Sequence, residues 1–236
     1  MTTLNLHLTD DQADALRTAL GYELAKTETV NTCAPERTGP PEPDKNGTVT
    51  LTTDDFDDTG LYRWGDSITV ANHLVINVNR WVRFGEGIKA GEGIKAGEGI
   101  EAGGGIEAGG GIEAGWGIKA GWGIEAGGGI EAGWGIEAGW GIKAGGGIEA
   151  GWGIEAGGGI KAGGGIKAGG GIKAGGGIEA GEGIKAGWGI KAGEGFGLFA
   201  GVSVNIKNPD RTIECARHDG GDIRYGELVL IEGGGE

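Results

Sequence analysis

A six-residue unit, Gly-x-Gly-Ile-[Glu/Lys]-Ala, repeats eighteen times without interruption between Gly85 and Ala192. Four of its six positions never change. The second position holds Glu, Gly or Trp, and the fifth holds Glu or Lys. A short repeat with a fixed apolar position is typical of stacked units that bury a shared core. No other feature of this chain restricts its possible folds as strongly.

The unit has the alternation of a short β-strand. In an extended Ile-[Glu/Lys]-Ala segment, Ile and Ala point to one side and the charged residue to the other. The glycines that flank the second position predict corners with positive φ. A helix is disfavoured because two glycines in every six residues cost about 1 kcal/mol each relative to alanine. We therefore predict a β-solenoid; the alternatives are a bundle of polyproline-like helices and a disordered linker, although a linker does not require Ile at eighteen successive sites.

The tryptophans of the second position indicate how many units form one coil. Sorted in threes, one series holds four Trp, a second holds two, and the third holds none; the first series is Trp116, Trp134, Trp152 and Trp188, and the second is Trp122 and Trp140. This order predicts a mainly β, three-sided parallel solenoid with 18 residues per coil. Six such coils would rise about 29 Å at a strand spacing of ~4.8 Å. The handedness is left open.

The repeat resembles the hexapeptide-repeat parallel β-helix proteins, whose usual motif is [LIV]-[GAED]-x-x-[STAV]-x. The segment Ile-Glu-Ala-Gly-Trp-Gly matches the first two positions and departs at the fifth, where Trp, Gly or Glu stands. The resemblance covers residues 67–204 at most and implies an architecture. Many proteins of this class are acyltransferases with a histidine near the coils. His73 is the one histidine of the predicted coils, so we do not transfer that activity.

Counting in sixes beyond the perfect repeats defines three regions. Backwards, the Ile position falls on Val82, Ile76 and Val70; forwards, it falls on Phe196 and Val202. This phase predicts a solenoid over residues 67–204. Residues 1–66 are predicted as an acidic α+β cap, with a strand at 4–8, a helix from Thr9 and a Pro-rich linker at 33–48. Residues 205–236 are predicted as a short β cap.

The net charge of −14 bears on partners and location. Such an acidic chain is a poor match for nucleic acid or an anionic membrane surface. The N-terminal residues lack the basic and apolar regions of a signal peptide, and no apolar run is long enough to cross a bilayer. Cys33 and Cys215 have no metal or redox spacing. We expect a cytoplasmic, reduced protein; secretion with a Cys33–Cys215 bridge is the alternative.

Catalytic and cofactor motifs are missing from the sequence. Its three histidines are far apart, no Ser/His/Asp or Cys/His set is visible, and no GxxxxGK[ST] phosphate loop occurs. The GxGxxG spacing arises trivially from the repeat. We therefore predict that the protein is not an enzyme and uses no cofactor.

One acidic segment partly matches a calcium loop. Asp55, Asp57, Thr59 and Asp66 place oxygen side chains at alternating positions, with Gly60 for the turn. The twelfth position is Asp rather than Glu, and no helix is expected to follow. An ordinary acidic surface loop is the preferred interpretation, and the four residues remain a weak calcium candidate.

The tryptophans are the main candidate binding residues. Glu shares their position, and an unpaired charge is rarely buried, so we expect the second position to point outward at the corners. An exposed row of Trp is typical of a contact surface, although stacking between coils is an equally simple explanation. The charges are also banded: Glu125, Glu131 and Glu137 fall in one coil, and Lys161, Lys167 and Lys173 two coils later. The bands fit either drift of duplicated units or a match to a partner.

These observations predict a non-catalytic, protein-binding solenoid. Its negative charge suggests an inhibitor of the kind carried by phages and mobile elements, which would block a host nucleic-acid-binding complex by mimicking DNA. The alternatives are a structural spacer or self-assembling fibre segment and, more remotely, an ice-binding protein. Whether the protein is a monomer or a homo-oligomer stays open.

Overall fold

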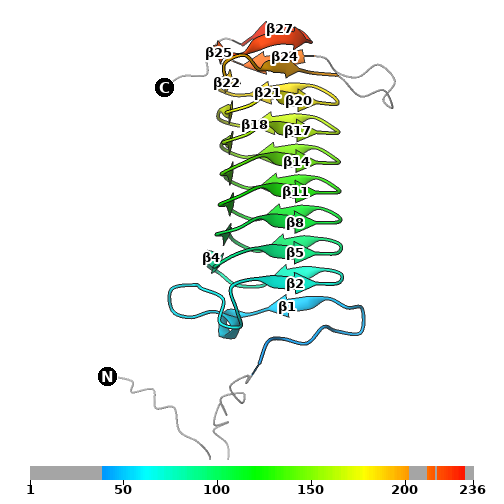
Figure 1. Cartoon of the computed structure of the whole chain (residues 1–236), viewed down its shortest axis with the longest axis vertical. Coiled ribbons are helices and arrows are strands. Elements are labelled where there is room, and N and C mark those ends of the chain that lie inside the picture. The colour runs from blue at the N-terminus through cyan, green and yellow to red at the C-terminus, as the bar shows by residue number, and fades with distance from the viewer. Residues whose placement is uncertain (1–38, 202–211, 216, 232–236) are drawn as a thin grey trace, which may run out of the picture. The chain divides into compact units, whose positions relative to one another are not determined.

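The computed structural model describes residues 39–201, 212–215 and 217–231. Several predicted features lie outside these residues: the strand at 4–8, the helix that follows it, and residues 33–38 of the linker, including Cys33. The described chain from Pro40 onward forms a β-solenoid of about eight turns, in which three parallel sheets run along a common axis. Figure 1 shows the coils stacked from β1 at one end to β27 at the other.

Each sheet makes one face of the solenoid. Face 1 has ten strands: β1 (Val49–Leu51), β3 (Leu74–Ile76), β6 (Ile94–Ala96), β9 (Ile112–Ala114), β12 (Ile130–Ala132), β15 (Ile148–Ala150), β18 (Ile166–Ala168), β21 (Ile184–Ala186), β24 (Thr212–Cys215) and β27 (Glu227–Leu230). Face 2 has eight: β4 (Val82–Phe84), β7 (Ile100–Ala102), β10 (Ile118–Ala120), β13 (Ile136–Ala138), β16 (Ile154–Ala156), β19 (Ile172–Ala174), β22 (Gly189–Lys191) and β25 (Arg217–Gly220). Face 3 has nine: β2 (Ile68–Val70), β5 (Ile88–Ala90), β8 (Ile106–Ala108), β11 (Ile124–Ala126), β14 (Ile142–Ala144), β17 (Ile160–Ala162), β20 (Ile178–Ala180), β23 (Gly197–Phe199) and β26 (Asp222–Tyr225).

The predicted 18-residue coil is confirmed by the strand register. Ile118 lies between Ile100 below and Ile136 above, and the same spacing of 18 holds through the perfect repeats. The chain passes from face 1 to face 2 to face 3 and then begins the next coil. Residues 18 apart are therefore vertical neighbours, so like side chains stack in ladders along each face.

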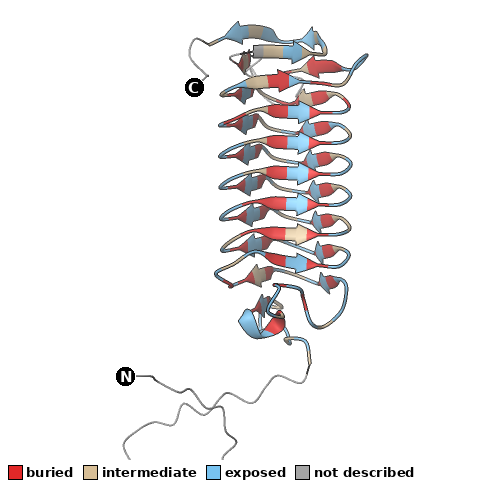
Figure 2. Cartoon of the chain, turned by 90° about the vertical axis from the view of Figure 1, so that its left-hand side faces the viewer, coloured by how far each residue is buried: buried red, intermediate tan, exposed pale blue. Residues whose placement is uncertain are grey.

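The core contains the Ile and Ala of every repeat. Ile118 and Ala120 keep 1% and 2% of their surface exposed, while Lys119 between them faces solvent. The same buried–exposed–buried pattern repeats along the strands (Figure 2). The inward side of each strand carries one large and one small residue. The isoleucine fills the interior, and the small alanine leaves room for side chains from the other two faces. The prediction that Ile and Ala point inward is confirmed.

The corner glycines do not adopt positive φ, and this expectation was wrong. Among the described residues, the glycines with positive φ all lie outside the perfect repeats. The first glycine of the unit is needed for a different reason, which is close approach between coils. A Cβ on Gly127, for example, would lie 2.0 Å from the carbonyl oxygen of Gly109 on the coil below. A side chain at this position would push the coils apart.

The hexad count fails below the perfect repeats. Ile68 pairs with Ile88 and Leu74 pairs with Ile94, a spacing of 20, because five residues connect β3 to β4 where a regular corner has three. Leu74 and Ile76 therefore hold the two inward positions of β3, whereas counting in sixes gave the Ile position to Ile76. Val78, in the longer connection after β3, is also buried. The solenoid sheets also begin earlier than residue 67, since β1 pairs with β3.

The count fails again above the repeats. Leu198, rather than Phe196, lies over Ile178, and the Phe196 side chain is 52% exposed. Val202 and Val204 lie outside the described residues. The predicted β cap at 205–236 contains β24, β25, β26 and β27 among its described residues, and these strands extend the same three sheets. The last coils are thus built from irregular lengths of chain.

Residues that follow β1 close the lower end of the core. The 3-10 helix η1 (Thr53–Asp55) leads into Phe56, which packs against Tyr62 and Phe84 with ring centroids 5.9 and 5.8 Å away. All three rings are buried. Asp55 is also buried and accepts hydrogen bonds from Thr52 N–H and Trp64 Nε1–H. This aromatic plug covers apolar surface that an open first coil would expose.

Candidate binding surface

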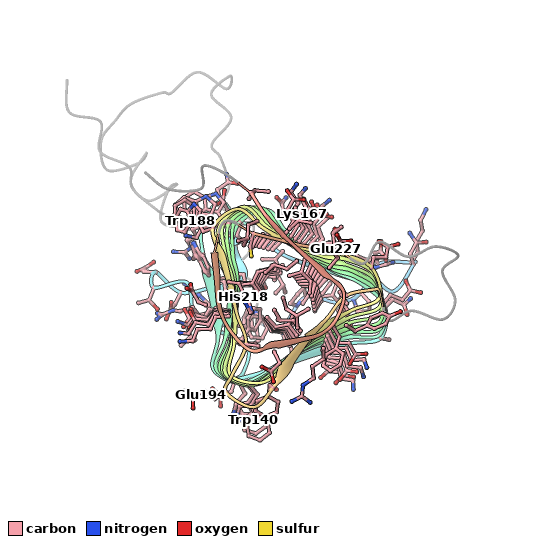
Figure 3. The ribbon with its side chains drawn as sticks, turned by 90° about the horizontal axis from the view of Figure 1, so that it is seen from above. Trp140, Lys167, Trp188, Glu194, His218 and Glu227 are labelled. Carbon is pink, nitrogen blue, oxygen red and sulfur yellow. The ribbon has the colours of Figure 1, made fainter. Side chains whose placement is uncertain are left out.

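Four indoles line one corner of the solenoid. Trp116, Trp134, Trp152 and Trp188 lie between faces 1 and 2, and their exposed fractions are 44%, 60%, 58% and 45%. We call this row the tryptophan edge. Figure 3, a view along the axis, shows Trp188 pointing outward at a corner of the triangular cross-section. The prediction that the second position points outward is confirmed.

Backbone hydrogen bonds fix the vertical order of the tryptophan edge. Trp134 N–H donates to the Trp116 carbonyl over 2.8 Å, and Trp152 N–H donates to that of Trp134 over 2.7 Å. The Trp116 and Trp134 rings stack in parallel, with centroids 5.4 Å apart and an interplanar angle of 5°. Trp152 and Trp188 are two coils apart with Gly170 between them, and their rings meet edge to face at 78°. Stacking and exposure therefore coexist on this edge.

The other two corners differ from the tryptophan edge. Trp122 and Trp140 lie between faces 2 and 3, where they stack with a centroid distance of 6.2 Å and are 64% and 71% exposed. We call them the second pair. The corner between faces 3 and 1 carries Glu or Gly at this position through the perfect repeats. The predicted sorting of Trp onto two of three corners is confirmed.

A groove runs along face 2 beside the tryptophan edge. Its floor is formed by the glycine at the third position of successive repeats, here called the third glycine. Indoles form the wall on one side, and the stacked Glu and Lys side chains of the fifth position form the other. Its volume is about 560 Å³, within the usual range of ligand sites. Trp81, at the lower end of the groove, contributes to its lining. Sequence reasoning missed Trp81, although it stands where the repeats place their third glycine.

The charges of the fifth position are mostly paired within the solenoid. Eight of its nine lysines lie within 3.2 Å of a glutamate on an adjacent coil. Lys167, for instance, bonds Glu149 over 2.6 Å, which raises the pKa of Lys167. The Glu and Lys bands of the sequence therefore meet as opposite charges along each face. This pairing supplies an internal reason for the charge order that requires no partner.

The three glutamates predicted as binding residues are not brought together. Glu125 lies on face 3, Glu131 on face 1 and Glu137 on face 2. Glu125 bonds Lys143, and Glu137 bonds Lys119. Only Glu137 borders the groove beside the tryptophan edge. Since one coil passes over all three faces, residues that are close in the sequence point in three directions.

In the segment named as a weak calcium candidate, the carboxylates of Asp55 and Asp57 accept local hydrogen bonds. Asp57 accepts from the Thr59 hydroxyl, Thr59 N–H and Leu61 N–H at 2.7–2.9 Å, and these bonds lower the pKa of Asp57. Asp55 is buried and accepts hydrogen bonds from Thr52 N–H and Trp64 Nε1–H. In the described part of the chain, no three His, Cys, Asp or Glu side chains are placed to hold a metal ion. The segment acts as a hydrogen-bonded turn.

Two further observations concern the cysteines and the membrane. Cys215 is buried at the end of β24, and its predicted alternative partner Cys33 lies outside the described residues. Over the ranges that the structure covers, no helix has the length and apolar character needed to span a membrane.

No protein-family model, curated protein or solved structure matches the sequence.

Proposed function

We propose that this chain is a protein-binding solenoid whose tryptophan edge contacts the partner. The observation that supports the proposal is the exposure of four aligned indoles, each between 44% and 60% accessible. Exposed aromatic clusters on soluble proteins are typical of interaction sites, and Trp is enriched among the residues that dominate binding energy. Glycine stands at the same position in many repeats, so the fold itself does not require an indole there.

The paired ladders favour an aromatic contact over a charged one. Because most fifth-position lysines contact a glutamate on an adjacent coil, each of the three faces carries both charges. A DNA mimic needs a long dense row of negative charge, and the longest run of glutamates on a repeat face is three, Glu113, Glu131 and Glu149 on face 1. The acidic excess is larger in residues 1–66, where thirteen acidic residues face five basic ones. The inhibitor role therefore stays a prediction that depends on residues outside the repeats. The cytoplasmic location also stays a prediction.

Affinity capture with matched variants tests the proposed function. The full chain, immobilised as bait in a lysate of the source cells, should retain a defined protein. The triple variant Trp116→Gly, Trp134→Gly, Trp152→Gly should lose it, while the control Trp122→Gly, Trp140→Gly should keep it. Both sets place Gly where the repeat already tolerates it, so both should remain folded by circular dichroism. Equal retention by all three baits would exclude the tryptophan edge as the contact surface.

A further inference from the structure

Trp81 shows how the groove on face 2 holds an aromatic ring. This residue replaces the third glycine of a repeat just before β4, and its ring extends over the two coils above. A Cβ on Gly99 would lie 2.3 Å from Trp81 Cε2, and one on Gly117 would lie 2.9 Å from its Cη2. The indole therefore occupies the space that side chains at both glycines would fill. Only 39% of Trp81 remains exposed.

From this arrangement we infer that the rest of the groove binds aromatic side chains of a protein partner. Each ring would lie on the floor across two consecutive third glycines, as Trp81 does. Above Trp81 the floor continues through Gly135, Gly153, Gly171 and Gly189. It thus offers two more pairs of adjacent glycines. This inference rests on the proposed function and specifies the chemistry of the partner.

Face 2 differs from the other faces in its walls. Faces 1 and 3 also carry grooves with glycine floors, of about 790 and 760 Å³, but no tryptophan lines either of them. On face 2, Trp134, Trp152 and Trp188 form one wall. An inserted ring would contact backbone below and indole beside it, and aromatic pairs contribute about 0.5–1.5 kcal/mol beyond the area that they bury.

The distance between successive glycine pairs on the groove floor indicates which backbone conformation the partner segment has. Two coils rise about 9.6 Å at ~4.8 Å per coil. In a polyproline II helix, residues three apart project on the same side and lie about 9.3 Å apart. A segment of this form with an aromatic residue at every third position would place one ring on each pair of glycines. Pro-rich segments commonly bind in aromatic-lined grooves, because their conformation is ordered before binding.

A synthetic peptide provides the direct test. Acetyl-Trp-Pro-Pro-Trp-amide, which has one Trp for each of the two remaining glycine pairs, should bind to the full chain in isothermal calorimetry with a Kd tighter than about 1 mM. The same peptide with Leu in place of Trp should bind at least about tenfold more weakly, because it lacks the aromatic contacts. Absence of binding by the Trp peptide, or equal binding by both peptides, would overturn the inference.

Alanine on the groove floor tests the site. In Gly153→Ala, Gly171→Ala, the new Cβ atoms would sit 3.3 and 3.4 Å from the nearest backbone oxygens, so the fold should tolerate them while the methyl groups lift the ring. We expect at least about a tenfold loss of peptide affinity. The control Gly111→Ala, Gly129→Ala, at the same position on face 1, should bind like the wild type. Equal losses in both variants would place the peptide elsewhere.

Two further outcomes distinguish this inference from the proposed function alone and from self-association of the chain. If lysate capture depends on the tryptophan edge but the peptide does not bind, the proposed function stands and the aromatic-segment inference is wrong. If the chain self-associates in sedimentation velocity, and Gly153→Ala, Gly171→Ala abolishes that association, the groove is occupied by a second copy and the assignment to a different protein is wrong. A monomer that binds the Trp peptide supports the inference as stated.

Discussion

At the residue scale, the two invariant glycines of the repeat serve different purposes. In most repeats the first glycine lies against a carbonyl of the coil below, where a Cβ would come to about 2 Å from the oxygen. At the glycine of the third position, a Cβ would lie 3.1–3.4 Å from the nearest backbone oxygen, and this glycine forms the floor of the surface grooves. Both look identical in the sequence. The distinction depends on contacts between residues 18 apart, which only the stacked coil shows.

We predict that alanine lowers the free energy of unfolding much more at the first glycine than at the third. Gly127→Ala should lower the free energy of unfolding by about 1–3 kcal/mol, because it overpacks the contact between two coils. Gly129→Ala has 3.3 Å to its nearest backbone oxygen and should change stability by less than about 0.5 kcal/mol, since the reduced entropy of the unfolded chain offsets the close contact. Urea unfolding of both variants measures the difference. Equal destabilisation would show that the close approach is not what selects the first glycine.

The Lys167–Glu149 pair gives a prediction about protonation. Lys167 Nζ donates a hydrogen bond to Glu149 Oε1, and this bond together with the negative charge of Glu149 raises the pKa of Lys167. A raised folded-state pKa favours the folded protein below the unfolded value of 10.5, and this contribution disappears as the pH rises through the folded value. In Glu149→Gln, NMR titration of the Lys167 Nζ should give a lower pKa than in the wild type. An unchanged pKa would mean that the pair does not form in solution.

At the scale of the elements, three-residue strands are stable because each belongs to a long ladder. A lone strand of this length buries little, but Ile118 packs between Ile100 and Ile136 and is 1% exposed. The irregular elements lie at the two ends. There, a five-residue connection below β4 and an altered corner after Ala192 shift the register by two residues. Counting in sixes could not detect these shifts, because Ile76 and Phe196, on which the count falls, are as apolar as Leu74 and Leu198, which hold those positions.

The aromatic plug leads to a prediction about local stability. Phe56→Ala should cost about 3–5 kcal/mol, because it leaves a cavity between Tyr62 and Phe84 in a fully buried position. Since a solenoid transmits such changes mainly to adjacent coils, the loss should be local. Hydrogen exchange should accelerate in β2 and β4 and stay unchanged in β14. A uniform acceleration along all coils would contradict nearest-neighbour coupling.

At the scale of the whole molecule, the coil rather than the hexad is the unit that can be removed. Deleting residues 157–174 takes out one coil, including Gly170, and brings Trp188 to a spacing of 18 from Trp152. It also places Lys185 over Glu149 and Lys191 over Glu155. We predict a folded protein in which the two indoles change from an edge-to-face contact to a parallel stack. A stronger exciton couplet in circular dichroism would report this change.

A shorter deletion is the control for the coil prediction. Removing residues 157–162 takes out one hexad and moves every later strand to the preceding face in chain order, so that β18 would join face 3. Trp188 would then leave the tryptophan edge, so the couplet from Trp152 and Trp188 should be lost while that of Trp116 and Trp134 remains. If both deletions give the same spectrum, the 18-residue coil does not govern where the indoles lie.

The sequence alone was sufficient for the repeating part of this protein. Alternation in Ile-[Glu/Lys]-Ala, the sorting of Trp in threes and the exchange of Trp with Glu predicted the strands, the three faces and the outward indoles, because identical short units have few ways to bury one side. The tertiary structure decided what depends on contact across coils. It paired Lys with Glu along each face, separated Glu125, Glu131 and Glu137, laid Trp81 over Gly99 and Gly117, and assigned the first glycine to close packing. These contacts join residues 18 or more apart, and the pattern within a single unit contains no information about them.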